Sequence, residues 1–299
     1  MRFVGALLIG LTVLPGHLAA SSLVEVPYLS NDVQAGKLPA IADRVPAQVD
    51  VVNLKATGKV PGQYGGKLHL LMGKQKDTKM MMVYGYARLI VYNHDLDFVP
   101  DLLESFDVKE EREFTLRLRK GHKWSDGHPF TAEDFRYYWE DMANDKSVSK
   151  KGLPSALLVE GEGPTFEVLD ETTVRYTWNK PNPNFVTWVA RPRPLLLYRP
   201  AHYLKQFHAK YSDEAKLNAM AAKENKQNWG QLHGDRDRWY RMDNPDRPTL
   251  QPWYNSVKPP SERFVFKRNP YYHRVDKNGL QLPYVDEVII NLGATNMIP

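Results

Sequence analysis

Residues 113–142 place the strongest limits on what this chain can fold into. The run FTLRLR (114–119) alternates apolar and polar side chains, which is the two-residue period of a strand with one buried face. Thr131 followed by Asp134 forms a capping box, which marks the start of a helix. Apolar side chains then recur at helical spacing: Phe135, Tyr138, Trp139 and Met142. The segment is therefore predicted to be a strand, a turn and an amphipathic helix.

A metal or acid–base site is the alternative interpretation of this segment, because it also holds two histidines and several acids. His122 and His128 lie six residues apart with the turn sequence 125–127 between them, whereas helical zinc ligands stand four apart. Turn and capping roles account for the acids, since Asp and Thr side chains bond nearby backbone amides. We therefore predict that the segment is scaffold, that both histidines face solvent, and that the chain has no metal site.

The rest of the chain mixes strand patterns with helix patterns. Single strands are predicted at 66–72, 262–269 and 286–292, and hairpins at 107–119 and 166–178. A helix is predicted within 80–93, although Gly85 weakens it, and another at 213–224. The remainder of 205–262 is expected to be a long loop. The mixture indicates an α/β or α+β class, and 299 residues are enough for two ordinary domains.

The N-terminus has the pattern of a secretory signal peptide. One positive charge at Arg2 precedes twelve apolar residues (FVGALLIGLTVL), and the small-residue stretch LAASS follows. A membrane span needs about 20 apolar residues, so this run is too short to be one. The sequence has no cysteine that could carry a lipid anchor or a disulfide. We expect residues 1–20 to be removed, leaving an exported periplasmic protein without a lipid anchor.

Charge and motifs argue against two broad functional classes. The 40 basic and 35 acidic residues are interleaved along the chain, so no nucleic-acid-binding surface is expected. The sequence contains no G-x-S-x-G, no Walker A motif and no H-E-x-x-H, and Pro164 interrupts the fragment GEG. We therefore predict a non-enzyme with no catalytic residue and no cofactor. A secreted hydrolase whose acid and base come from distant segments stays open as an alternative.

The run EFTLRLRKGHKWSDGHPFTAEDFRYYWEDM (113–142) closely resembles the characteristic segment of the family 5 extracytoplasmic solute-binding proteins. Members of that family are the oligopeptide, dipeptide and nickel receptors of ABC importers. Three further stretches also resemble the family: YGGKLHLL (64–71), PTFEVLDETTVRYTWNKPNPNF (164–185) and FVFKRNPYYHRVDKNGLQLPYVDEVIINL (264–292). The resemblance covers essentially the whole chain after the signal peptide, and it is most specific at 113–142.

The resemblance implies an α/β fold, the first lobe of a type II periplasmic binding protein (venus-flytrap) together with the extra domain of this family. Family members are considerably longer, so we expect an N-terminal portion, from a truncated or split gene, whose second lobe is largely missing. The expected divisions are 1–20 signal peptide, 21–62 extended arm, 63–88 first lobe, 89–190 extra α+β domain and 191–299 first lobe again.

The resemblance also implies capture of a small solute, a peptide or an oligosaccharide, and delivery to ABC permease subunits at the inner membrane by a monomer. On the first lobe, ligand contacts are expected in the loop after the strand 66–72 and at two tyrosines: Gly73, Lys74, Asp77, Tyr84 and Tyr86. Core packing is the alternative role of both tyrosines. In the peptide receptors the residues that clamp the ligand's termini come from the later half, so none is carried over. A receptor-derived fragment with a chaperone-like role and no transport is another open alternative.

Overall fold

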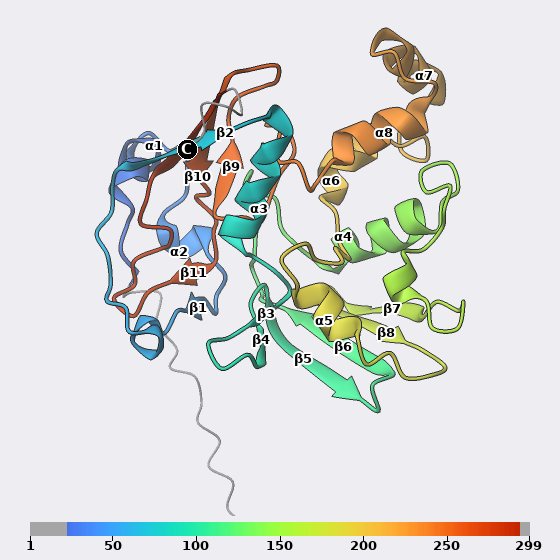
Figure 1. Cartoon of the computed structure of the whole chain (residues 1–299), viewed down its shortest axis with the longest axis horizontal. Helices are drawn as coiled ribbons and strands as arrows, with labels where there is room; N and C mark the ends of the chain where they lie inside the picture. The colour runs from blue at the N-terminus through green and yellow to red at the C-terminus, as the bar shows by residue number, and fades with distance from the viewer. Residues whose placement is uncertain (1–22, 294–299) are drawn as a thin grey trace, which may run out of the picture.

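Two four-stranded sheets organise the computed structural model, which describes residues 23–293 (Figure 1). The two ends of the described chain, blue and red in Figure 1, lie side by side around the first sheet, while green and yellow segments build the second. The predicted signal peptide, residues 1–20, lies outside the described residues. Every helix within 23–293 is too short or too polar to cross a lipid bilayer.

The first sheet joins segments that are far apart in the sequence. Its strand order is β2-β12-β10-β9, with β2 and β12 parallel and the other pairs antiparallel. The strands are β2 (Lys67–Met72), β9 (Trp253–Asn255), β10 (Arg263–Arg268) and β12 (Glu287–Leu292). Buried side chains of β2, β10 and β12 pack with Met81 in one apolar core. The three predicted single strands are confirmed.

The second sheet consists of two hairpins, and both were predicted from the alternating pattern. Its order is β5-β6-β8-β7, antiparallel throughout. The strands are β5 (Leu103–Lys109), β6 (Glu113–Leu118), β7 (Thr165–Asp170) and β8 (Thr173–Thr177). At the first turn, between the paired residues Lys109 and Glu113, Glu110 and Glu111 both have φ of 52°, a left-handed backbone found in tight hairpin turns. The turn sequence KEER therefore closes this hairpin.

A capped helix covers the second sheet, as predicted from Thr131 and Asp134. α4 (Ala132–Arg136) begins with a capping box and continues as the π-helical segment η5 (Tyr137–Ala143). The Asp134 carboxylate accepts the Thr131 backbone N–H at 3.0 Å, and the Thr131 hydroxyl accepts the Glu133 N–H at 3.3 Å. Phe135 is fully buried against Phe130 and Tyr198 in the core that the helix shares with the sheet, so the cap fixes the start of a core helix.

Two predicted elements differ from the structure, and local geometry explains both. Within 80–93 the helix α3 (Met80–Gly85) ends early, because Tyr86 adopts a left-handed φ of 44°. A short strand follows, β3 (Ile90–Tyr92), which pairs with β4 (Phe98–Pro100). Gly85 packs against Gln251 so closely that a Cβ would lie 2.6 Å from the Gln251 side-chain oxygen. The predicted long helix was therefore wrong beyond Gly85.

The predicted long loop within 205–262 holds a further helix, α8 (Trp229–Asp237). Asn228 caps it by accepting the Gln231 N–H at 3.0 Å. The sequence WGQLHGDRD contains two glycines and a weak apolar stripe, so the helical period is hard to detect. The predicted helix at 213–224 is confirmed as α7. The neighbouring helical segments are α5 (Phe185–Ala190), α6 (Ala201–Leu204), η7 (Lys205–Phe207) and α7 (Glu214–Lys223).

The N-terminal arm carries short helices and is fixed to the body of the molecule. Its elements are η2 (Pro27–Leu29), α1 (Ser30–Gln34), α2 (Ile41–Arg44), β1 (Asp50–Val51) and η3 (Leu54–Thr57). β1 pairs with β11 (Arg274–Val275). The buried Arg44 side chain bonds Glu25 at 2.6 Å and the carbonyl of Pro270 at 3.0 Å. Residues 195–204 share a core with the second sheet, and the five-part division of the chain stays a prediction.

Candidate functional site

The loop after β2 lies at an edge of the first sheet where two parallel strands end together. The Gly293 N–H, just past β12, donates to the Met72 carbonyl at 2.9 Å, so the ends of β2 and β12 are in contact. Gly73 and Lys74 follow β2 directly, and the Lys74 side chain is exposed. In open α/β sheets, ligands bind outside the carboxyl ends of the strands. The predicted residues Gly73 and Lys74 therefore stand where this fold places binding sites.

Asp77 shapes this loop through its own backbone contacts. Its carboxylate accepts the Lys74 N–H at 3.0 Å and so begins the 3-10 helix η4 (Gln75–Lys79). The buried Thr78 hydroxyl contacts the carbonyl of Arg241 at 2.7 Å, which ties η4 to a segment more than 160 residues further on. Asp77 therefore holds the conformation of this loop.

The two predicted tyrosines have different environments. Tyr84, at the end of α3, is 52% exposed. Tyr86 is half-buried, and its hydroxyl donates to the Ala190 carbonyl at 2.9 Å while the Arg88 guanidinium lies 5.1 Å from its ring centre. Tyr84 is thus open to solvent, whereas the Tyr86 hydroxyl is bonded to Ala190, the last residue of α5.

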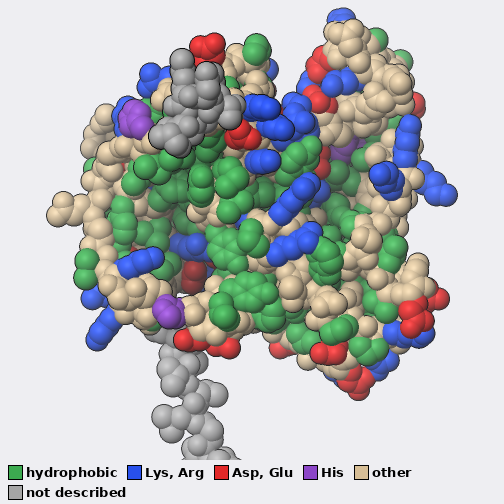
Figure 2. All heavy atoms as spheres, in the orientation of Figure 1, with side chains coloured by type: hydrophobic (Ala, Val, Ile, Leu, Met, Phe, Trp, Pro, Cys, Tyr) green, Lys and Arg blue, Asp and Glu red, His purple; other side chains and the backbone are tan. Residues whose placement is uncertain are grey.

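A cleft lies beside α3, and we call it the α3 cleft. Its volume is about 270 Å³, and three separate segments line it: Lys79, Met80, Met82 and Val83, then Pro192 and Arg193, then Tyr240. Figure 2 shows hydrophobic side chains together with Lys and Arg side chains over the middle of this face. None of the five residues predicted as ligand contacts lines this cleft. Pro192, Arg193 and Tyr240 were missed because they come from segments far from α3. The run RPRP (191–194) was the available signal, since it alternates cations with stiffening prolines.

Arg88 holds two walls of this cleft together. Its side chain is 1% exposed, and its guanidinium donates to the carbonyls of Met82, at 3.0 Å, and Pro192. A third bond goes to the Arg191 carbonyl at 3.3 Å. Burial lowers the pKa of Arg88, but the ordinary pKa of arginine lies so far above neutral pH that the side chain stays charged. One buried cation therefore links α3 to the loop at 191–192.

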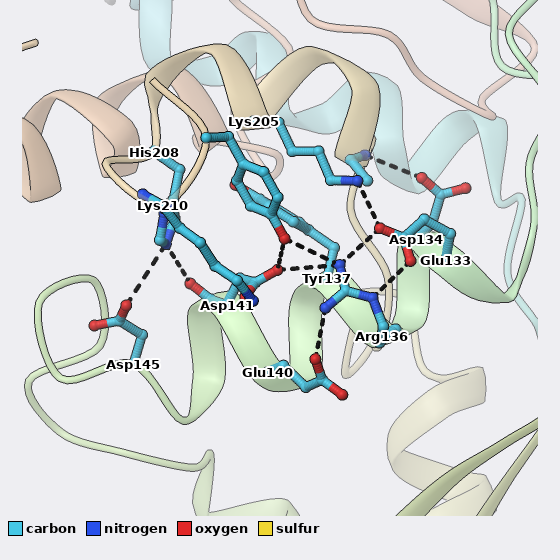
Figure 3. Close-up of polar contacts among 12 residues, drawn as sticks. Glu133, Asp134, Arg136, Tyr137, Glu140, Asp141, Asp145, Lys205, His208 and Lys210 are labelled. Atoms are coloured by element: carbon cyan, nitrogen blue, oxygen red, sulfur yellow. Dashed lines mark hydrogen bonds and ion pairs between the residues drawn. The ribbon is translucent and has the colours of Figure 1, made fainter. Parts of the chain in front are cut away.

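The segment that most constrained the sequence prediction is scaffold, as expected for its acids. The Asp134 carboxylate also accepts the Trp124 indole N–H at 3.2 Å and the Ala201 N–H at 3.0 Å. Burial outweighs these donors and raises the pKa of Asp134 to about 7. In Figure 3, Arg136 lies between Glu133 and Glu140, with both distances at 2.6 Å. Each of these charges has a partner within the chain.

The prediction that both histidines of this segment face solvent was wrong for His122. Its side chain is 1% exposed and lies against His273, with ring centres 5.0 Å apart. Burial lowers the pKa of His122 well below its ordinary value, so the ring is neutral. The short extended piece after the turn carries it inward, which the two-residue pattern alone did not reveal. His128 is exposed and stacks on His202 at 3.8 Å.

Asp50, Asp101 and His273 form a cluster with the ligand types that a metal ion takes. Arg274 already occupies it, with its guanidinium 2.7 and 2.8 Å from the two Asp101 oxygens. His273 bonds the same carboxylate at 2.7 Å. Burial alone would raise the pKa of Asp101, but Arg274 and His273 lower it below its ordinary value. The group is therefore an ion-pair network that joins β1, β11 and the turn before β5.

Comparison with known proteins defines the class to which this architecture belongs. The model of the family described as "Bacterial extracellular solute-binding proteins, family 5 Middle" matches residues 97–297, about two thirds of the chain. The chain belongs to this family of solute-binding proteins. That result confirms the resemblance seen at 113–142.

Individual relatives include receptors for different solutes. The periplasmic alpha-galactoside-binding protein of Rhizobium meliloti (strain 1021) is 29% identical over 280 residues, which are 86% of this chain and 37% of that protein. The periplasmic oligopeptide-binding protein OppA of Escherichia coli (strain K12) is 31% identical over 119 residues, 36% of this chain and 22% of that protein. The chain thus spans well under half the length of these relatives.

Solved structures give the same class. An oligopeptide-binding protein OppA superimposes with a TM-score of 0.82 at 30% identity, covering 92% of this chain and 42% of that one. The periplasmic binding protein MelB of Agrobacterium fabrum C58, in complex with stachyose, gives 0.70 at 25% identity, covering 93% and 43%. The predicted α/β periplasmic binding protein fold is confirmed, over about two fifths of each structure.

Proposed function

We propose that this chain is the substrate-binding component of an ABC importer, exported to the periplasm, and that it captures a peptide-like solute for a membrane permease. The observation that carries the proposal is the α3 cleft, together with the exposed Tyr84 on the helix that lines it. Membership of a solute-binding family and the peptide-binding relatives support it. No sequence motif for catalysis competes with it, so we propose binding without turnover.

Within this site the residues divide by what their side chains already contact. Lys74 and Tyr84 are exposed, and Gly73 presents backbone at the edge of the sheet, so we propose these three as solute contacts. The Asp77 carboxylate is bonded to the Lys74 backbone and the Tyr86 hydroxyl to the Ala190 backbone. We therefore propose that these two residues hold the contacting groups in position.

An oligosaccharide is the second candidate solute. An exposed tyrosine ring such as Tyr84 can stack on the apolar face of a sugar, and aromatic side chains combine apolar area with a polar end. The relatives that bind an alpha-galactoside and stachyose favour this candidate. A receptor-derived fragment that binds neither class is the third candidate, and binding data separate all three.

Equilibrium dialysis of the full chain against tetrapeptides and against stachyose tests the proposal. We expect saturable peptide binding, no chemical change in the recovered peptide, and weaker binding of stachyose. Tighter binding of stachyose would select the oligosaccharide candidate. A folded chain that binds neither, as shown by a cooperative thermal transition, would contradict capture by this form of the protein. Hydrolysed peptide in the dialysate would instead support the enzyme alternative.

A further inference from the structure

Two of the residues that line the α3 cleft, Lys79 and Arg193, are cations without an acidic partner among the described residues. Among residues 23–293, six Lys and Arg side chains on the segments forming or adjoining the cleft make no ion pair within 4 Å: Lys74, Lys76, Lys79, Arg191, Arg193 and Arg241. Buried and half-buried arginines elsewhere are paired, as Arg44 is with Glu25 and Arg199 with Asp237, both within 2.7 Å. The positive charge at the cleft is therefore not neutralised by the described part of the chain.

Local geometry holds part of this charge in place. The Arg191 side chain donates to the Arg193 carbonyl at 2.6 Å and lies 3.9 Å from the centre of the Trp188 ring. Prolines at 192 and 194 fix the backbone on either side of Arg193. Burial and then the charge of Arg193 lower the pKa of Arg191, which agrees with a local excess of positive charge. The Arg191 side chain is therefore held in place beside the backbone of Arg193.

The cleft between these cations is apolar. Met80, Met82, Val83 and Pro192 line it, and the Tyr240 ring lies between Arg193, at 5.4 Å, and Arg241, at 5.9 Å. Sites for whole ligands are usually about 300–1,000 Å³. A volume of about 270 Å³ therefore suits one apolar group of a larger solute, with room for an acidic group at the cationic rim.

The two acids that lie near the cleft in the sequence form no ion pair with its cations among the described residues. Asp77 is the acidic residue of η4, and its carboxylate accepts the Lys74 N–H. Asp243 follows Arg241 and Met242, but it is buried and 1% exposed. An uncharged sugar would offer no counter-charge to Lys79 and Arg193, whereas a carboxylate-bearing solute would pair with them at short range.

We propose that the solute bound at the α3 cleft carries carboxylate groups beside an apolar portion, so that the receptor selects acidic solutes. This inference rests on the proposed capture of a solute at this cleft. The required chemistry could come from an acidic peptide or from an oligosaccharide of uronic acids. Lys79 and Arg193 are the cations that line the cleft itself, and they are the contacts on which selection depends.

The test is isothermal titration calorimetry of the full chain with matched probes. One arm compares tetrapeptides that differ only by Glu in place of Gln beside a Phe, and the other compares trigalacturonate with a neutral galactose trisaccharide. We expect the acidic member of one pair to bind roughly tenfold more tightly than its neutral match. The difference should shrink as salt rises from about 0.05 M to about 0.5 M, where screening shortens to a few ångströms. The arm that shows it identifies the solute class.

Two variants test whether the selection arises at the cleft. Lys79→Gln with Arg193→Gln should abolish the preference, whereas the matched pair Lys151→Gln with Arg263→Gln, exposed residues elsewhere, should keep it. Lys79→Glu should turn the preference toward a lysine-containing peptide. Equal Kd values for acidic and neutral probes, or a preference that survives the cleft variant, would overturn this inference and leave solute capture intact. A folded chain that binds no probe would overturn the proposed function as well.

Discussion

The capped-helix segment and the α3 cleft use charge in opposite ways. In the segment around α4, Arg136 lies within 2.6 Å of two carboxylates and Asp134 accepts three N–H donors. At the cleft, Lys79 and Arg193 have no acidic partner among the described residues. Charges that a fold needs are satisfied inside the chain, whereas charges left over at a cleft are available to a ligand. The contrast agrees with a scaffold role for the first region and supports the proposed binding at the second.

The largest expected effect is the loss of stability in Asp134→Ala. Three N–H groups lose their acceptor, and two of them belong to the Trp124 ring and the Ala201 backbone in the core. We expect the free energy of unfolding to fall by about 2–4 kcal/mol. Urea unfolding followed by circular dichroism measures the loss, with the exposed Asp95→Ala as a control that changes it little. A loss below about 1 kcal/mol would show that the cap is dispensable.

Arg88→Met tests a buried charge whose bonds lie at the cleft rather than in the capped-helix segment. The carbonyls of Met82 and Pro192 lose their donor, so we expect a loss of about 1–3 kcal/mol, partly offset by removal of a buried charge. Peptide affinity should also fall, even under conditions where the variant is fully folded, because the loop at 191–192 is released from α3. The exposed Arg263→Met is the control. Unchanged peptide affinity in a folded Arg88→Met variant would show that Arg88 does not contribute to binding.

The raised pKa of Asp134 predicts a pH dependence. An acid whose pKa is about 7 in the folded chain and near 3.8 when unfolded binds more protons in the folded state between these values. Its contribution to stability is therefore complete below about pH 4 and decreases as pH rises to 7. Comparing urea midpoints of the wild type and Asp134→Asn across this range should show a shallower decrease in the variant. If the urea midpoints of the two proteins change with pH in parallel, groups other than Asp134 cause the pH dependence.

The smallest expected effect is on affinity alone. Tyr84→Ala removes an exposed ring, so the thermal midpoint should stay within about 1 °C while peptide affinity falls roughly tenfold, or about 1.4 kcal/mol. Tyr84→Phe should retain most of the affinity if the ring stacks, and lose it if the hydroxyl bonds the solute. Leu169→Ala, on exposed β7, is the matched control. If both Tyr84 variants bind the peptide as tightly as the Leu169→Ala control, Tyr84 does not contact the solute.

The sequence predicted the first region well because its determinants are local. The alternation in 114–119 and the spacing of Thr131 and Asp134 each fit within a few residues, so the hairpin and the cap followed directly. The buried position of His122 could not be predicted, since it depends on contact with His273, about 150 residues away.

The cleft itself was not predicted, because its determinants are not local, and the five predicted contact residues stay a prediction. Gly73 and Lys74 follow a recognisable strand, so their place at an edge of a sheet could be expected. Arg193 and Tyr240 reach the cleft only when the loop after α5 and the segment after α8 fold against α3. The role of Arg88 also depends on that packing, because its acceptors are backbone carbonyls, which no side-chain motif marks.

Hydrogen–deuterium exchange of the full chain, with and without a saturating acidic tetrapeptide, tests the assignment of binding to the cleft most directly. Binding there should slow exchange at 73–86, at 190–193 and near residue 240, while 113–142 exchanges as before. Ordered scaffold has no reason to respond to a solute that it does not touch. Protection confined to 113–142, or spread away from α3, would contradict the assignment.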